Sequence, residues 1–172
     1  VATRSIFRDV TAQRRTDQAL QAQHRRQSAL ASLELAVNQQ HELRAVLDRL
    51  VQIVTERLPA SGGASIILWD AASEVFTSSA STVPGQETNL GARRARTEGG
   101  ATRWIIDLLE PLIVADIRKD PFRANQLLPA FGLKAYAGVP LLAEGQPLGV
   151  LYALGTELRQ YSPEDIEFLS AL

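Results

Sequence analysis

Cysteine and methionine are both absent from the 172 residues of this chain. Without Cys there are no disulfides, no thiolate metal ligands, no Cys nucleophile and no thioether-linked cofactor. The absence of Met, the initiator included, predicts a processed or excised piece of a longer protein. No apolar run approaches about 18 residues, and no apolar stretch follows the polar N-terminus as in a signal peptide. We therefore expect a cytoplasmic fragment without membrane contact.

Charge is nearly balanced over the whole chain, at a formal −1, but it is unevenly distributed. Residues 1–30 hold six Arg against two Asp, a net +4, which leaves −5 for the rest. A basic arm of this kind sometimes binds nucleic acid. Here no aromatic residues interleave with the Arg residues, so the solvated face of a helix is favoured and no nucleic-acid partner is expected.

Glycine and proline are both missing from residues 12–58, whose composition is helical. Residues 12–28 are too polar for a core, which favours a linker helix supported by pairing with a second copy of itself. An apolar stripe at helical spacing follows from residue 30 to residue 58. Its polar interval at 38–42 is consistent with a break between two helices.

The remainder alternates between short apolar runs and turn residues. Strands are expected at residues 4–10, 64–69, 74–80, 112–115, 135–142 and 147–154, with a further short one near 89–90. Short helices are expected at 102–109, 120–128 and 163–172, the last two begun by Asp-Pro and Ser-Pro. Pro140 within a strand predicts a bulge or a gap in the ladder. This order predicts an α+β fold, with an antiparallel sheet of five or six strands and helices from both ends of the domain on one face.

One part of the chain resembles a known family. Ala137-Gly138-Val139-Pro140-Leu141, then Gly145, Leu148-Gly149-Val150-Leu151 and Tyr161-Ser162-Pro163-Glu164-Asp165 resemble the hairpin and final helix of a GAF domain, a small-molecule sensor of signalling proteins. Leu112-Ile113-Val114-Ala115-Asp116 and Asp120-Pro121 resemble its middle, although Leu109-Glu110 stands where many members carry Gly. The resemblance spans residues 30–172 and implies a GAF/PAS-like sheet.

The N-terminal segment resembles the end of a PAS domain. Its motif is Asp9-Val10-Thr11-Ala12-Gln13-Arg14-Arg15, which in that family closes the domain and opens a linker helix. The implied organisation is a PAS end at 1–11, a signalling helix at 12–29 and a GAF-like sensor at 30–172. Together the two resemblances imply a bacterial multi-domain sensor, such as a histidine kinase or a diguanylate cyclase.

The known chemistries of GAF domains fit these residues poorly. The methionine sulfoxide reductase of this fold works through Cys, and bilin attachment needs Cys in most members, whereas this chain has none. Haem sensors of the fold use a pocket His, but His24 and His41 lie in the helical N-terminal part. The Asn-Lys pattern of cyclic-nucleotide binders is absent, since neither Lys119 nor Lys134 follows Asn. The cofactor is therefore unknown.

A pocket between the sheet and the middle loops remains the candidate site, with no catalytic or metal-binding residue assigned to it. The aromatic side chains expected to line this pocket suit a packed core equally well. Gly99-Gly100 before a helix, and the Asp116/Asp120 pair, fit a solvated loop and a strand end better than an anion or metal site. The candidate pocket residues are Trp104, Ile105, Asp116, Phe122, Leu127, Phe131, Tyr136 and Tyr152.

Two functions follow from these observations. The first is a non-catalytic sensory module that binds a small molecule and passes the change through flanking helices, as a homodimer joined by its N- and C-terminal helices. The alternative is a structural dimerisation module whose pocket is filled by its own side chains.

Overall fold

The computed structural model describes residues 27–28, 32, 35, 37–58, 62–119 and 129–172. The chain divides into two units, Val1–Leu43 and Arg44–Leu172, which are treated separately below. The strand expected at 4–10, most of the linker helix and the helix expected at 120–128 lie outside the described residues. In the described part of the first unit every residue is helical and exposed.

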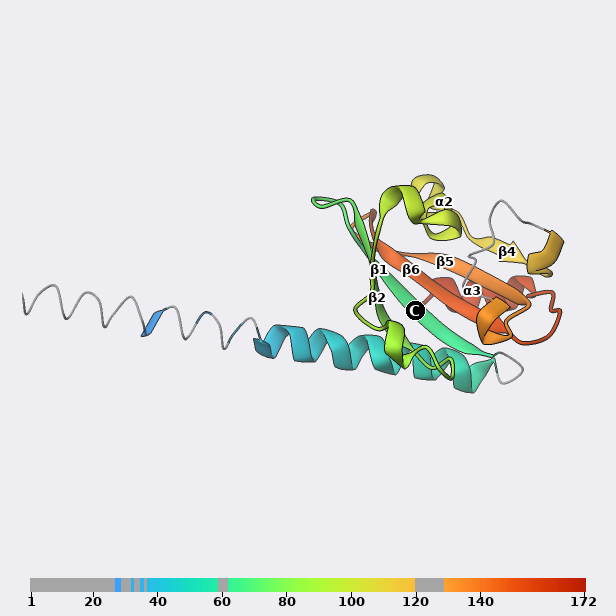
Figure 1. Ribbon diagram of the computed structural model, residues 1–172, viewed down its shortest axis with the longest axis horizontal. Coiled ribbons are helices and arrows are strands. Elements are labelled where there is room, and N and C mark those ends of the chain that lie inside the picture. Colours follow the sequence, from blue (N-terminus) through green and yellow to red (C-terminus); the bar gives the residue numbers. More distant parts are fainter. Residues whose placement is uncertain (1–26, 29–31, 33–34, 36, 59–61, 120–128) are drawn as a thin grey trace, which may run out of the picture. The chain divides into compact units, whose positions relative to one another are not determined.

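Six antiparallel strands form the sheet of the second unit, in the order β3-β2-β1-β6-β5-β4 (Figure 1). The strands are β1 (Gly63–Asp70), β2 (Val75–Ser81), β3 (Arg93–Ala95), β4 (Leu112–Val114), β5 (Ala135–Ala143) and β6 (Gln146–Gly155). The helices are one covering residues 37–57, α2 (Gly100–Leu108) and α3 (Pro163–Ser170). The expected α+β class with an antiparallel sheet is confirmed.

Two hairpins form where turn residues interrupt the apolar runs. After β1, the Asp70 carboxylate accepts hydrogen bonds from the Ala72 amide at 3.0 Å and the Ser73 hydroxyl at 2.6 Å. Between β5 and β6, Glu144 and Gly145 both have positive φ, at 51° and 77°. This is the backbone pattern of a type I′ turn, whose twist matches that of the flanking strands.

The two faces of the sheet are covered by different elements. On one face Leu47, Val51 and Val54 of the N-terminal helix pack with Leu169 of α3 against the strands. On the other face Ile105 and Ile106 of α2 pack against Ile67 and neighbouring core residues. Figure 1 shows α2 and the part of the N-terminal helix in the second unit, residues 44–57, on opposite sides of β1 and β6. The expected covering of one face by helices from both ends of the domain is therefore confirmed.

A β-bulge in β2 changes the face that its side chains meet. Ile66 pairs with Ala80 and Ile67 pairs with Ser78, so Ser79 is the extra residue. Ala80 consequently joins the core under the helices, while Phe76, four residues earlier, joins the core under α2. Without the bulge these two side chains would share one face, because the side-chain period of a strand is two.

Three local predictions are wrong. The helix runs through 38–42 without a break, because this interval is exposed and contains no Gly or Pro. The short strand near 89–90 is instead a 3₁₀ helix, η1 (Glu87–Asn89), and the edge strand follows at Arg93–Ala95. At Pro140 the pairing with Val150 stays in register, and the irregularity falls between Leu141 and Leu142.

Three further 3₁₀ turns complete the described segments: η2 (Arg96–Glu98), η3 (Ile117–Lys119) and η4 (Pro129–Phe131). Within the described ranges, no helix has both the length and the apolar composition needed to cross a bilayer.

Gly138 of β5 lies in close contact with side chains of α2 and β6. A Cβ atom there would lie 2.6 Å from both Ile105 Cδ1 and Tyr152 Cε1. We predict that Gly138→Ala lowers the free energy of unfolding by about 1–3 kcal/mol through overpacking, measured by urea denaturation. Adding Ile105→Val removes one of the two clashing atoms, so the double variant should lose less than the sum of the single effects. Strict additivity would contradict this packing constraint.

Candidate functional site

A cavity of about 100 Å³ lies on the α2 side of the sheet. Strands β1, β2 and β6 form its floor, with Tyr136 contributed by β5. The segment from Gln86 to Arg94, the start of α2 and Phe131 of η4 form its other walls. By the same measure a single water molecule needs about 10–15 Å³, so the space admits a small organic molecule.

Two buried hydroxyl groups lie in this cavity. Thr102 and Tyr152 are 4% and 6% exposed, and their hydroxyl oxygens are 2.9 Å apart in a hydrogen bond. The Tyr152 ring packs edge-on against Tyr136, with 5.8 Å between centroids. Burial raises the pKa of Tyr152 well above its ordinary value, against the opposing effects of the Thr102 hydrogen bond and the Arg94 charge. The phenol is therefore neutral at physiological pH and acts as a hydrogen-bonding group.

Further polar side chains line the wall opposite α2. Ser81 donates a hydrogen bond to Gln86 Oε1 at 3.0 Å and accepts one from the Val83 amide at 3.2 Å. In contrast, the side chains of Ser65, Ser78 and Asn89 make no hydrogen bond to any other residue that the structure describes. The cavity thus offers donors and acceptors that the described protein does not itself use.

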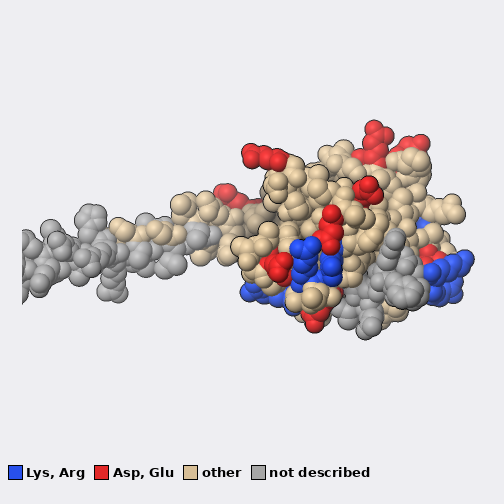
Figure 2. Space-filling model, turned by 90° about the horizontal axis from the view of Figure 1, so that it is seen from above, with Lys and Arg blue, Asp and Glu red and all other residues tan. Residues whose placement is uncertain are grey.

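Arg94 is the charged residue of the cavity lining. Within the described residues its guanidinium has no carboxylate partner, and no Asp or Glu lines the cavity. Two neighbouring arginines do have carboxylate partners. Arg96 pairs with Glu74 and Asp107, and Arg103 also pairs with Asp107. In Figure 2 basic and acidic side chains lie side by side on the surface seen from above.

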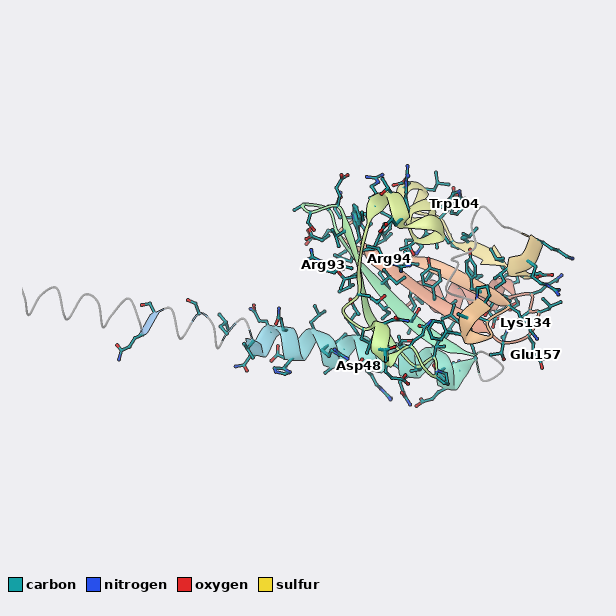
Figure 3. The ribbon with its side chains drawn as sticks, viewed as in Figure 1. Asp48, Arg93, Arg94, Trp104, Lys134 and Glu157 are labelled. Atoms are coloured by element: carbon teal, nitrogen blue, oxygen red, sulfur yellow. The ribbon has the colours of Figure 1, made fainter. Side chains whose placement is uncertain are left out.

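The sequence-predicted pocket residues separate into four groups. Phe131, Tyr136 and Tyr152 line the cavity. Ile105 is fully buried in the core beneath α2, and Trp104 is partly buried against the same core, on the part of α2 nearer to β4 (Figure 3). Asp116 lies outside the cavity, and Phe122 and Leu127 lie outside the described residues.

Asp116 holds the turn after β4 rather than lining the cavity. Its carboxylate accepts hydrogen bonds from the Arg118 amide at 3.0 Å and from Nε and Nη2 of the same residue at 2.9 Å. The Arg118 hydrogen bond, opposed by desolvation, lowers the pKa of Asp116 to about 2. The carboxylate borders a separate shallow hollow beside Lys119 and Arg159.

Ser78, Thr102 and Arg94 line the cavity although the sequence pattern does not predict them as pocket residues. In the structure Ser78 pairs with Ile67 and lies on the same face of the sheet. The sequence gives no sign of the bulge at Ser79, so this register between β1 and β2 could not be predicted. Arg94 lies in a segment without apolar alternation, so the sequence does not predict the strand that directs it into the cavity. The available signal was a group of basic residues close to Gly99-Gly100, namely Arg93, Arg94, Arg96 and Arg103.

Gly99 has a packing role in the structure. A Cβ atom on Gly99 would collide with the ring of Phe76, so this glycine lets α2 start close to the sheet. In the described parts of the chain, no group of three His, Asp or Glu side chains is placed to hold a metal ion.

The Asp116 interaction predicts a pH-dependent contribution to stability. A carboxylate with a folded pKa of about 2, against an ordinary 3.8, stabilises the fold fully above pH 4. That contribution is lost as the pH falls toward 2. We expect Asp116→Asn to be less stable than wild type at pH 7, by urea denaturation, with a difference that shrinks from pH 4 to pH 2. A difference independent of pH would contradict the role of the charge.

Comparisons with known proteins agree with this fold. The profile of the GAF domain family matches residues 40–172. No curated protein matches the chain.

Among solved structures, the PixJ GAF domain of Thermosynechococcus elongatus, in its blue-light absorbing form, is 21% identical with a TM-score of 0.61. The alignment covers 76% of this chain and 79% of that one. Free methionine-R-sulfoxide reductase of Neisseria meningitidis, in complex with its substrate, is 20% identical with a TM-score of 0.61, over 74% and 71% of the two chains.

A domain of a putative two-component sensor histidine kinase from Sinorhizobium meliloti is 18% identical with a TM-score of 0.57, over 72% and 81%. At these identities the likenesses concern the fold. The family match spans most of the chain, and this chain belongs to the GAF domain family.

Proposed function

We propose that this GAF domain is a sensory module that binds a small molecule in the cavity beneath α2. The observation that carries the proposal is the cavity itself, with its buried Thr102–Tyr152 pair and hydroxyl groups left without protein partners in the described structure. Buried polar groups need hydrogen-bond partners, and a ligand supplies them.

The relatives support a binding role for this fold. The reductase from Neisseria meningitidis was solved with its substrate, and the PixJ domain has a blue-light absorbing form. The likeness to a histidine kinase domain supports a place in a signalling protein. The kinase or cyclase parent, the preceding PAS domain and the cytoplasmic location stay predictions.

We propose a non-catalytic role. The chain contains no Cys, and among the described residues no His lines the cavity, since His41 lies elsewhere and His24 falls outside the described part. The lining therefore offers hydrogen bonds and one guanidinium charge rather than a nucleophile with its base.

Ligand occupancy has a direct route to the flanking helix. Ile66 borders the cavity and belongs to the core under the 37–57 helix. Tyr152 faces the cavity, whereas its neighbours Leu151 and Ala153 face the helices. A ligand that prefers one arrangement of these strands biases the position of the helix.

Filling the cavity tests the binding role. Ser78 faces the cavity from β2, so Ser78→Leu should exclude the ligand. We expect native mass spectrometry of the purified wild-type chain to reveal a bound small molecule, and Ser78→Leu to reduce its occupancy at least about tenfold.

The matched control is Thr77→Leu, the preceding position, which pairs with Leu68 and faces the other side of the sheet. This variant should retain the bound molecule. A wild-type protein that carries no ligand, and whose melting temperature stays unchanged across a screen of nucleotides and metabolites, would favour the alternative function of a structural dimerisation module.

We also propose that two copies associate through the N-terminal helix. Beside the buried stripe, Leu43 and Val46 are 51% and 56% exposed, and Leu50 and Ile53 are half-buried. The spacing of three, four and three residues is that of a coiled-coil seam. The sheet thus leaves a second apolar stripe uncovered. A contribution from α3 stays a prediction.

A charged side chain within this stripe should separate the copies. We expect Val46→Glu to weaken self-association at least about tenfold, measured by sedimentation equilibrium, because a carboxylate would be desolvated at the seam. Gln52→Glu adds the same charge at an exposed position outside the stripe and should leave the dissociation constant unchanged. Equal effects of both variants, or a wild type that is monomeric at high concentration, would contradict the proposed seam.

A further inference from the structure

The cavity contains a positive charge that the described protein leaves uncompensated. Arg94 lies on β3, whose register with β2 pairs Arg94 with Phe76 and Arg93 with Thr77. The two Arg side chains therefore leave opposite faces of the strand. In Figure 3 Arg93 lies at the outer edge of the sheet and Arg94 on the side toward β6.

The positions of the carboxylates explain why this charge stays unpaired. Asp70 accepts hydrogen bonds from Ser73 and Ala72, which lower its pKa with a smaller contribution from the Arg93 charge, and Glu74 pairs with Arg96. Neither side chain lines the cavity. Within the described structure Arg94 therefore has only neutral groups around it in the cavity, and its charge acts on the hydroxyl of Tyr152.

The Thr102–Tyr152 pair supplies a second, independent observation. Each hydroxyl group carries one hydrogen, and the single hydrogen bond between them uses only one of the two. Whichever group donates, the other retains a buried hydrogen with no acceptor among the described residues. Leaving a buried donor unsatisfied is costly, so the site calls for an acceptor atom from outside the protein.

We propose that the cavity binds a small organic monoanion whose carboxylate pairs with Arg94, while a ligand oxygen accepts the remaining hydrogen of the Thr102–Tyr152 pair. This inference rests on the proposed function and specifies the ligand class of the same site. A guanidinium matches the planar carboxylate with two parallel hydrogen bonds.

The cavity also restricts the body of the ligand. Its floor is largely apolar, with Ile67, Leu154 and the two Tyr rings, which suits an aromatic or branched aliphatic group. Among the residues that the structure describes, Arg94 is the one cation lining the cavity, so a carboxylate is balanced whereas a doubly charged phosphate is not. A branched-chain or aromatic carboxylic acid fits both the charge and the walls.

Matched pairs of anionic and neutral compounds test this class. The probes are benzoate with benzamide, phenylacetate with phenylacetamide, and 4-methylpentanoate with its amide, added to the ¹⁵N-labelled 172-residue chain. Binding is followed by shifts of the assigned amide resonances of cavity residues. We expect each carboxylate to bind at least about tenfold more tightly than its amide.

Two charge variants give the matched comparison. Arg94→Gln should remove the preference for carboxylates, whereas Arg93→Gln removes the same charge from the adjacent position and should preserve it. Thr102→Val deletes one of the two buried hydroxyl groups. It should weaken the binding of each carboxylate and of its matching amide by the same factor. Urea denaturation of each variant shows that the fold is retained, and the preference measured in the wild type stands independently of the variants.

The outcomes separate this inference from the proposed function. If the amides shift the same cavity resonances as strongly as the carboxylates, the anionic class is overturned and the binding role remains. If none of the six compounds shifts a cavity resonance and the purified wild type also carries no ligand, both the class and the binding role are overturned. A carboxylate preference that persists in Arg94→Gln would overturn the assignment of this residue.

Discussion

The register between β1 and β6 is the constraint on which the rest of the domain depends. Ile66 pairs with Leu151 and Ile67 with Val150, at the centre of the sheet. Because side chains alternate, this register places Ile66 and Leu151 under the helices and Ile67 and Val150 under α2. A slip of one residue in this register would move each of these side chains to the opposite face of the sheet, so that both cores would lose their packing partners. The helix layer and the cavity are thus two consequences of one pairing.

Small residues on the two faces of the sheet let the covering helices pack at different distances from the strands. The helix face of the sheet is rich in alanine, including Ala64, Ala137 and Ala153, so the helices pack close to the strands. On the α2 face Gly138 and Gly99 admit Ile105 and Phe76 at short range. Beyond these contacts, the serines of β1 and β2 are too short to reach α2, and the cavity occupies the remaining space.

The sequence allowed the fold to be predicted more fully than the site. The β5–β6 hairpin carried a turn and two apolar arms, and α3 carried Ser162 and Asp165, which form a capping box in the structure. The edge strand β3 was missed because Arg93–Ala95 pairs through its backbone and has no apolar pattern. Site residues depend on which face a side chain meets, and the bulge at Ser79 changes that face without a sequence signal. Asp116 was expected to line the pocket, but its carboxylate pairs instead with Arg118, two residues along the chain.

The arrangement has a mechanical consequence for sensing. The central strands have the cavity on one side and the 37–57 helix on the other, and Val51 and Val54 are completely or almost completely buried on the helix side. Close-packed cores transmit displacement because they have little space in which to absorb it. The α2 side contains the cavity, so a ligand entering it, as we propose, would change the volume on that side. Under that proposal, strand movement would begin on the side with space and reach the helix, whose second apolar stripe is exposed at Val46.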